Sequence, residues 1–361
     1  MIKPDKYLPK YYQLKEYLKN MIQNGDIIPP QKLPSESDLV RQFKISRHTV
    51  RHAFSELENE GWIYREQGKG TFCAFRGSKK EQKIAVLTTY ISNYIFPYII
   101  RGIEETLCES GFSFSIASTG NNKLKEEECM KRFLEQDISG IIVEPTKSAK
   151  PNINQKYFQE LDKRNIPYIL LHATYPGLDS AYVIMNDEKG GFIATEYLLK
   201  LGHKNIAGIF LSDDLQGIRR QEGFLFALKK YNLTVNNEFL GNYKTEQMFT
   251  FPYNFTLNLL KKENRPTAIV CYNDQIAIQV IEAIRRSNLK IPQDISLVGY
   301  DDSNLAVATE VKLTTIKHPK EEMGKRVAHM IIDMINREAN DPYFVYEPEL
   351  VIRSSCKIIS K

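Results

Sequence analysis

The stretch LPSESDLVRQFKISRHTVRHAFSELENEGW, residues 33–62, contains the strongest structural signals of the amino-terminal part of the chain. Ser35 can cap the free amides of a helix, and Asp38, three residues later, completes a capping-box pattern ahead of apolar residues. Ser46 can cap a following helix that runs to Gly61. Because only a short turn separates the two helices, the stretch predicts a helix-turn-helix.

The second of these helices has an apolar face and a polar one. The polar face carries Arg47, Thr49 and Arg51, together with two histidines, on the amino-terminal half of the helix. A helix in the major groove of DNA presents such side chains to base edges, where Arg suits the two acceptors of guanine. A solvated basic face is the alternative interpretation of the same pattern.

Two flanking elements favour the DNA-binding interpretation. An amphipathic helix is expected from Lys10 to Asn24, and Lys10 at its start is a plausible phosphate contact. After the helix-turn-helix, two short strands are expected around Gly68-Lys69-Gly70. Such a hairpin forms a wing that can bring Gln67 and Lys69 near the minor groove or the phosphates, although this type of turn is often only a turn.

Charge is unevenly distributed along the 361 residues. Residues 1–80 contain 15 Lys and Arg against 9 Asp and Glu, about +6, which leaves about −1 for the remainder of the net +5. A cationic amino-terminal unit suits a phosphate backbone. The five cysteines are scattered without a zinc-ligand pattern, so we expect free thiols and no metal. With no apolar run of bilayer length and no signal-like start, we expect a cytoplasmic protein.

The remainder of the chain predicts an α/β architecture. Short apolar runs alternate with amphipathic stretches, as βαβ units require. These runs occupy residues 84–87, 140–143, 168–171, 206–210, 268–271 and 295–298. They are too numerous for one ordinary doubly wound unit, so we expect two lobes with parallel sheets and a cleft between them. The expected organisation is a winged helix over residues 1–76, a linker over 77–83 and a sensor domain over 84–361.

Candidate ligand-binding residues lie where the expected strands end, because ligands of α/β sheets bind outside the carboxyl ends of strands. A carboxylate beside a guanidinium can fix vicinal hydroxyls, and an aromatic ring can cover the C–H face of a sugar. The candidates are Tyr90, Phe96, Glu144, His172, Arg220, Asn273, Asp301 and His318. Each has a structural alternative: Asn273 as a helix cap, Arg220 in a surface ion pair, Phe96 in the core, and His172 or His318 as satisfied structural histidines.

The first part resembles the winged-helix domain of GntR-type bacterial regulators over residues 8–74. The resemblance rests on LPSE at 33–36, ISRHTVR at 45–51 and GKGTF at 68–72. It implies that Arg47, Thr49, Arg51 and Gly68 approach DNA, and that operator DNA is a partner.

The second part, residues 84–354, resembles the effector-binding domain of LacI-type repressors, itself similar to periplasmic sugar-binding proteins. The marks are GGFIATEYLLKLGH at 190–203, RQEGF at 220–224, YND at 272–274, VGYDD at 298–302 and LTTI at 313–316. The resemblance implies that Arg220, Asp301 and Asn273 contact a small-molecule effector. The hinge helix usual in LacI-type regulators is replaced by a polar linker.

The two resemblances together point to a small group of regulators. With TTYISNYIFP at 88–97 and VEPTKS at 143–148, the chain resembles the arabinose-responsive repressors of Gram-positive bacteria. That resemblance implies L-arabinose as the effector and genes for arabinose uptake and catabolism as targets. Our hypothesis is that a homodimer holds two winged helices at palindromic half-sites and that ligand, by closing the lobes, changes their spacing and releases the DNA.

Two other function classes fit the sequence less well. Some winged-helix regulators carry an aminotransferase-like body, but no phosphate-cradling loop, catalytic triad or metal constellation is evident, so we expect no enzyme, no catalytic residues and no cofactor. A transport-type binding protein is disfavoured by the fused winged helix. A regulator of the same architecture that senses another sugar, a purine or an amino acid remains open.

Overall fold

The computed structural model describes residues 9–66, 68–74, 82–338 and 342–359. Contacts divide the chain into two units, Met1–Gln82 and Lys83–Lys361, each of which is described by itself. The expected linker over 77–83 falls mostly outside the described residues, and the first strand of the second unit begins at Lys83.

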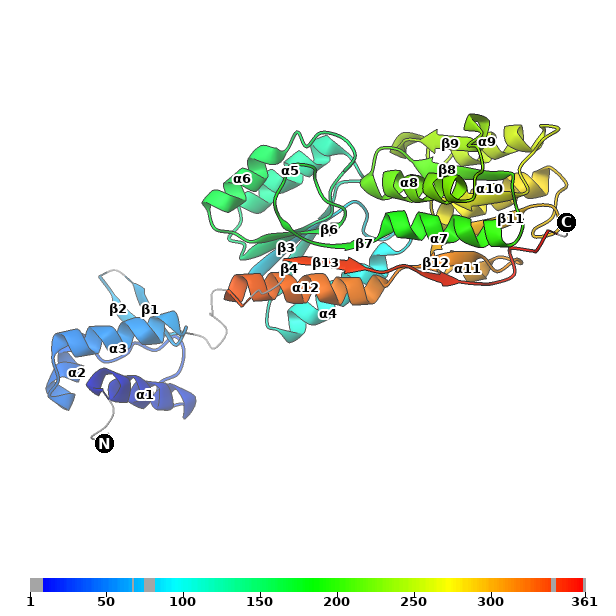
Figure 1. Cartoon of the computed structure of the whole chain (residues 1–361). Coiled ribbons are helices and arrows are strands. Elements are labelled where there is room, and N and C mark those ends of the chain that lie inside the picture. Colours follow the sequence, from blue (N-terminus) through cyan, green and yellow to red (C-terminus); the bar gives the residue numbers. More distant parts are fainter. Residues whose placement is uncertain (1–8, 67, 75–81, 339–341, 360–361) are drawn as a thin grey trace. The chain divides into compact units, whose positions relative to one another are not determined.

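The first unit consists of three helices and a hairpin (Figure 1). The helices are α1 (Lys10–Gln23), α2 (Glu36–Phe43) and α3 (Arg47–Asn59), and strands β1 (Ile63–Glu66) and β2 (Gly70–Cys73) pair antiparallel. The capping box at α2 is present: Ser35 accepts from the Asp38 amide, and the Asp38 carboxylate accepts from the Ser35 amide. Ser46 caps α3 by accepting from the Thr49 amide. The winged helix-turn-helix expected from the sequence is therefore confirmed.

A single apolar core holds this unit together. It is built from α1, α2 and α3 and closed by the hairpin. Its fully buried residues include Leu14, Leu18, Leu39, Val50 and Leu57. Because these residues use up the inner face of α3, the polar residues of that helix remain on its outer face.

The second unit contains two lobes, each with a six-stranded sheet covered by helices on both faces (Figure 1). In the first lobe the strand order is β13-β7-β6-β5-β3-β4 and every pair is parallel. Its strands are β3 (Lys83–Thr88), β4 (Ser113–Ser118), β5 (Gly140–Val143), β6 (Tyr168–His172), β7 (Ala181–Met185) and β13 (Tyr343–Tyr346). Its helices are α4 (Phe96–Glu109), α5 (Lys123–Leu134), α6 (Gln155–Lys163) and α12 (Lys320–Asn336).

The second lobe repeats this plan with strand order β14-β12-β11-β10-β8-β9, in which only the pair β12 and β14 is antiparallel. Its strands are β8 (Ile206–Leu211), β9 (Leu240–Tyr243), β10 (Ala268–Cys271), β11 (Ser296–Asp301), β12 (Thr314–Lys317) and β14 (Glu349–Val351). Its helices are α7 (Asp187–Lys200), α8 (Leu215–Lys230), α9 (Phe251–Leu260), α10 (Asp274–Arg286) and α11 (Leu305–Ala308), with 3-10 turns at Asn237–Phe239 and Thr245–Gln247.

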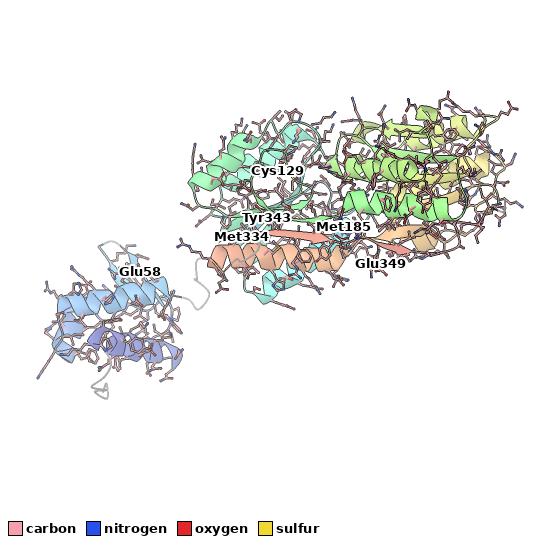
Figure 2. The ribbon with its side chains drawn as sticks, viewed as in Figure 1. Glu58, Cys129, Met185, Met334, Tyr343 and Glu349 are labelled. Carbon is pink, nitrogen blue, oxygen red and sulfur yellow. The ribbon has the colours of Figure 1, made fainter. Side chains whose placement is uncertain are left out.

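The chain passes between the lobes three times: from β7 to α7, from β12 to α12 and from β13 to β14. Met185 and Glu349, labelled in Figure 2, flank two of these crossovers. One apolar cluster continues from the first lobe into the second, while the outer face of each sheet has a core of its own. This arrangement confirms the expected two-lobed α/β domain and directs the carboxyl ends of both sheets toward the space between the lobes. None of the helices in the described ranges is long and apolar enough to cross a lipid bilayer.

Candidate functional site

The outer face of α3 carries the predicted DNA contacts. Arg47 and Arg51 are exposed, and Thr49 is half-buried with its hydroxyl 2.8 Å from that of the cap residue Ser46. The Arg51 Nε donates to Glu36 at the start of α2, over 3.0 Å. Arg47 and Arg51, one turn apart, therefore share an exposed face of the first turns of α3, with Arg51 oriented by a carboxylate from α2, while Thr49 lies around the helix beside its cap.

The hairpin and the start of α1 carry the other predicted DNA contacts of this unit. Gly68 has a φ of +77°, a left-handed conformation that glycine adopts without strain. Lys69 is exposed at the tip and pairs with Glu66 over 2.9 Å. Lys10 is exposed at the first position of α1. Gln67 lies outside the described residues.

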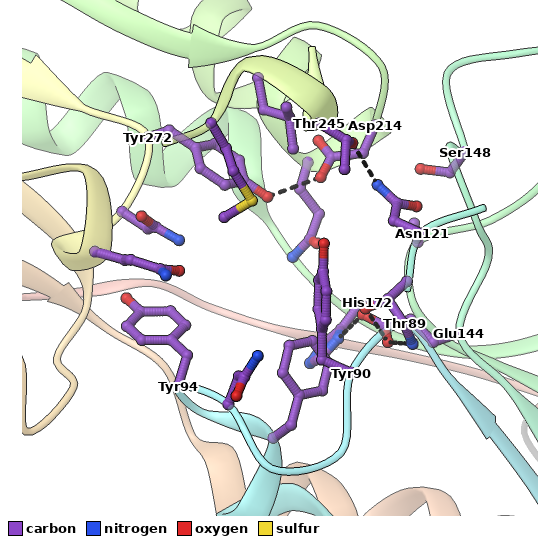
Figure 3. A pocket seen from close by; sticks show the side chains of 18 of the residues that line it. Thr89, Tyr90, Tyr94, Asn121, Glu144, Ser148, His172, Asp214, Thr245 and Tyr272 are labelled. Carbon is purple, nitrogen blue, oxygen red and sulfur yellow. Dashed lines mark hydrogen bonds and ion pairs between the residues drawn. The ribbon is translucent and has the colours of Figure 1, made fainter. Parts of the chain in front are cut away.

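A cavity of about 250 Å³ lies between the two lobes of the second unit. Five of the eight predicted ligand-binding residues line it: Tyr90, Phe96, Glu144, His172 and Asn273. Arg220, Asp301 and His318 are not among the lining residues, although each is at least 97% buried. Figure 3 shows polar side chains of both lobes pointing into this space.

The first lobe contributes a hydrogen-bonded wall of the cavity. Glu144, which follows β5, accepts from the Thr89 amide over 2.6 Å and from the Thr89 hydroxyl over 2.7 Å. Its other oxygen lies 3.0 Å from His172 Nδ1 (Figure 3). The bond to Glu144 orients the imidazole, and its Nε2 is buried without a hydrogen-bond partner among the described residues. Phe96 packs edge-on to both His172 and Tyr90, which adds an aromatic surface.

Arg220, on α8, lies in a buried ionic network behind the cavity. Its Nε donates to Asp187 over 2.8 Å and its Nη1 donates to the Tyr272 carbonyl over 2.8 Å. Its guanidinium stacks on the Tyr300 ring, 3.6 Å from the centroid. Burial alone would lower the pKa of Arg220, but Asp187, Tyr300 and Asp301 together raise it well above its usual value. The alternative of a surface ion pair is therefore wrong, because the side chain is 2% exposed.

Two further predicted residues have buried polar atoms without partners. Asp301 ends β11 with a φ of +92°, and its Oδ1 accepts no hydrogen bond from the described residues, while Arg220 Nη2 lies 3.7 Å away. Both ring nitrogens of His318 also have no hydrogen-bond partner within the described ranges, and its ring lies 5.1 Å from that of His172. Burial of the ring is the main cause that lowers the pKa of His318 well below its usual value, and the neighbouring His172 lowers it further. Polar atoms buried this deeply without a hydrogen-bond partner are rare in folded proteins.

Asn273 combines a structural role with its place on the cavity. Its side chain caps α10 by accepting from the Ile276 amide over 3.0 Å, so the alternative of a helix cap is confirmed. Because the residue also lines the cavity, the cap does not exclude ligand contact.

The second lobe lines the cavity with residues that sequence reasoning missed. Asp214 accepts from the Tyr272 hydroxyl over 2.7 Å and from the Gly217 amide over 2.6 Å, and burial raises its pKa to about 7. The other lining residues not predicted include Asn121, Ser148, Gln216, Tyr243, Thr245, Phe249 and Gln275. Asp214 follows β8, so the strand-end rule could have found it. Asn121 and Thr245 follow edge strands that the apolar runs did not mark.

No group of three or more His, Cys, Asp or Glu side chains in the described ranges is arranged to hold a metal ion. The described cysteines form no disulfide, and all five are free thiols as expected. The chemistry of the cavity is thus that of hydrogen bonds, carboxylates and aromatic rings.

Comparison with known proteins extends over both units. Residues 10–73 match the gntR family of bacterial regulatory proteins, and residues 195–356 match the periplasmic binding protein-like domain. A LacI family transcriptional regulator from Enterococcus faecium, solved with bound ribose, aligns over 77% of this chain and 100% of its own, with a TM-score of 0.65 and 26% identity. The second unit therefore has the fold of LacI-type effector domains.

Two curated relatives match almost from end to end. The arabinose metabolism transcriptional repressor of Geobacillus stearothermophilus is 47% identical over 363 residues, covering 98% of this chain and 100% of the relative. That of Halalkalibacterium halodurans is 44% identical over 360 residues, covering 96% of each. These relatives are regulators, which confirms the expectation of a non-enzymatic protein. With this identity over the full length and with both domains present, the chain belongs to the family of arabinose metabolism transcriptional repressors, in which a GntR-type winged helix precedes a LacI-type effector domain.

Proposed function

We propose that this repressor is released from operator DNA when L-arabinose binds in the cavity between the lobes of its second unit. The observation that carries the proposal is the cavity itself, which combines carboxylates, a histidine and aromatic rings in one buried space. Sugar hydroxyls both donate and accept hydrogen bonds, and their C–H faces suit aromatic surfaces. The names of the full-length relatives support arabinose over other sugars.

We assign ligand contacts to both lobes. Glu144 and His172 would bind hydroxyls from the first lobe, with Tyr90 and Phe96 covering the C–H face, while Asn273 would bind from the second lobe. Arg220, Asp301 and His318 lie behind this lining, and the unpartnered atoms of Asp301 and His318 favour a ligand that reaches toward them. A ligand held from both sides stabilises the closed arrangement of the lobes.

We assign DNA contacts to the first unit. Arg47, Thr49 and Arg51 would meet the major groove, and Gln67, Gly68 and Lys69 of the wing would meet the minor groove or the phosphates. Lys10 would neutralise a phosphate at the start of α1.

We further propose that the protein acts as a homodimer on palindromic half-sites. Closure of the lobes would change the spacing of the two winged helices, as domain closure does in other switching proteins. A coupling of about 1–3 kcal/mol would change operator affinity by roughly 5- to 150-fold. Analytical ultracentrifugation with and without operator DNA measures the assembly state directly.

Calorimetric titration tests the effector. L-arabinose is compared with D-ribose, D-xylose, D-galactose and hypoxanthine on the wild type and on two neighbouring variants. Tyr90→Ala removes a ring that lines the cavity, whereas Ile91→Ala changes an exposed residue outside the lining. We expect selective L-arabinose binding that Tyr90→Ala weakens by about tenfold or more, the effect of losing roughly 1.4 kcal/mol, and that Ile91→Ala leaves unchanged. Tight binding of D-ribose or hypoxanthine with no response to L-arabinose would refute the effector assignment.

A further inference from the structure

A cluster of charged residues joins the two lobes at the rim of the cleft. Lys147, in the loop after β5 of the first lobe, forms an ion pair with Glu246 of the second lobe and lies 3.8 Å from Asp213 Oδ2. Asp213 follows β8 and is 1% exposed, whereas the Glu246 side chain is 64% exposed. One cation of the first lobe is therefore held between two carboxylates of the second.

Hydrogen bonds fix the position of this cation. Lys147 has a left-handed backbone with a φ of +43°, and its amide donates to Asn121 Oδ1 over 2.7 Å. Asn121 Nδ2 then donates across the cleft to Thr245 Oγ1 over 2.7 Å (Figure 3). The Thr245 amide donates to the Asp213 carboxylate over 3.1 Å. These contacts form a ring of interactions that crosses the cleft twice. They hold Lys147 in its left-handed backbone conformation and so compensate for its strain.

A neighbouring bond crosses the cleft as well. The Ser148 hydroxyl accepts from the amide of Leu215 over 2.8 Å. Leu215 is the first residue of α8, where an amide has no partner within the helix. The partner of this amide thus comes from the opposite lobe, and its exchange with solvent reports whether the lobes are closed.

The charged residues of the rim are separate from the cavity wall. Asn121, Ser148 and Thr245 line the cavity, but Lys147, Asp213 and Glu246 do not. Substitutions at Lys147 or Glu246 therefore change the contact between the lobes without removing a side chain that faces the cavity.

We propose that Lys147, Asp213 and Glu246 form a latch that holds the lobes closed. They are positioning residues: they set the fraction of the protein in the closed, ligand-ready form without contacting the ligand. Because the apparent dissociation constant equals the intrinsic one divided by that fraction, the latch sets the effector concentration at which DNA is released. The consequence for DNA release rests on the function proposed above, whereas the effect on closure does not.

Charge reversal tests the latch. Lys147→Glu brings three carboxylates together at the rim, and Glu246→Lys removes one of the two attractions. Lys150→Glu is the matched control, since it makes the same charge change on an exposed residue of the same loop for which no ion pair occurs in the described residues. Lys147→Gln gives a milder variant, and circular dichroism verifies folding of each protein.

Two measurements are made on each variant. Hydrogen exchange at the Leu215 amide, without effector, reports closure, and calorimetry with L-arabinose reports affinity. We expect Lys147→Glu to accelerate exchange and to weaken binding by about fivefold or more, at or above the upper end of the usual effect of an exposed pair, because Asp213 is buried. Lys147→Gln should have a smaller effect in the same direction, and Lys150→Glu should have none.

The double variant Lys147→Glu/Glu246→Lys provides the decisive comparison. The fold-loss of L-arabinose affinity in the double variant should be smaller than the product of the fold-losses in the two single variants. The reason is that the reversed pair restores one attraction. Unchanged Leu215 exchange in Lys147→Glu, or multiplicative losses in the double variant, would overturn the latch. If the wild type failed to bind L-arabinose, the effector assignment would fall, and the exchange data would still decide for or against the latch.

Discussion

Removing the Arg220 side chain should destabilise the effector domain as well as weaken ligand binding. In Arg220→Ala, Asp187 loses its 2.8 Å partner while remaining 95% buried, and Tyr300 loses the guanidinium stacked on its ring. Loss of ligand binding in this variant alone would therefore not show that Arg220 contacts the ligand.

The expected loss follows from the geometry. Breaking a buried ion pair by removing one partner costs about 3–5 kcal/mol, because the remaining charge stays buried without compensation. That is a large share of a typical unfolding free energy of about 5–15 kcal/mol. Burial already raises the pKa of Asp187 with Arg220 present, and without the guanidinium the pKa must rise further. The stranded carboxyl can protonate, so the loss should be smaller at pH 5 than at pH 7.5.

Urea unfolding of the wild type, Arg220→Ala and the double variant Asp187→Asn/Arg220→Met measures these effects. The double variant removes the charges of Asp187 and Arg220 and fills most of the space, so we expect it to recover part of the lost stability. Recovery stays incomplete because the buried Asp301, 3.7 Å from Arg220 Nη2 in the wild type, still loses this cation. Calorimetry on this folded variant then tests ligand contact by Arg220 without the stability effect. A loss of unfolding free energy below about 1 kcal/mol in Arg220→Ala, or a loss that does not depend on pH, would contradict a stabilising role of the buried Asp187–Arg220 pair.

Three further predictions concern other sites. Burial raises the pKa of Asp214 to about 7, from a value near 3.8 in the unfolded chain. The contribution of this carboxyl to folding stability is therefore complete below pH 3.8 and is lost as the pH rises through about 7. Asp214→Asn should remove this decline, and unfolding free energies at pH 5 and pH 8 measure it. Gly223→Ala would place a Cβ 1.9 Å from the Glu188 carbonyl oxygen and so force α7 and α8 apart. We expect thermal unfolding to show a loss of stability of about 2 kcal/mol or more. An unchanged melting temperature would contradict the close packing of these two helices. Lys69→Ala should reduce the slope of log DNA affinity against log salt concentration by about 0.9, for operator and random DNA alike. A loss of affinity confined to operator DNA would indicate a base contact instead of a phosphate contact.

Much of the first unit could be predicted from the sequence, because its signals are local. The capping residues Ser35 and Ser46 mark helix starts through bonds that span three residues, and the spacing of apolar residues on α3 identifies its buried face. Gly68 marks a turn through its own φ. The placement of Arg47 and Arg51 on the exposed face follows from the helical period alone.

The candidate effector site could be predicted only in part. Glu144 and His172 could be predicted because each directly follows an apolar run of the sequence, and both line the cavity. Arg220 was expected in the same set, but its neighbours in the fold, Asp187 and Tyr300, draw it into a buried network. The sequence does not reveal such partners, since they lie 33 and 80 positions away along the chain.

The order of the domains, their fold classes and the polar strand ends from which a binding site is made can thus be read along the chain. These features depend on periodicity and on hydrogen bonds between near neighbours. The folded chain alone shows which strand ends face one another, that Asp214 shares the cavity with Glu144, and that Lys147 meets Asp213 and Glu246 across the cleft. Such contacts arise where separate lobes close on each other, and their energies depend on burial and distance, which no local pattern encodes.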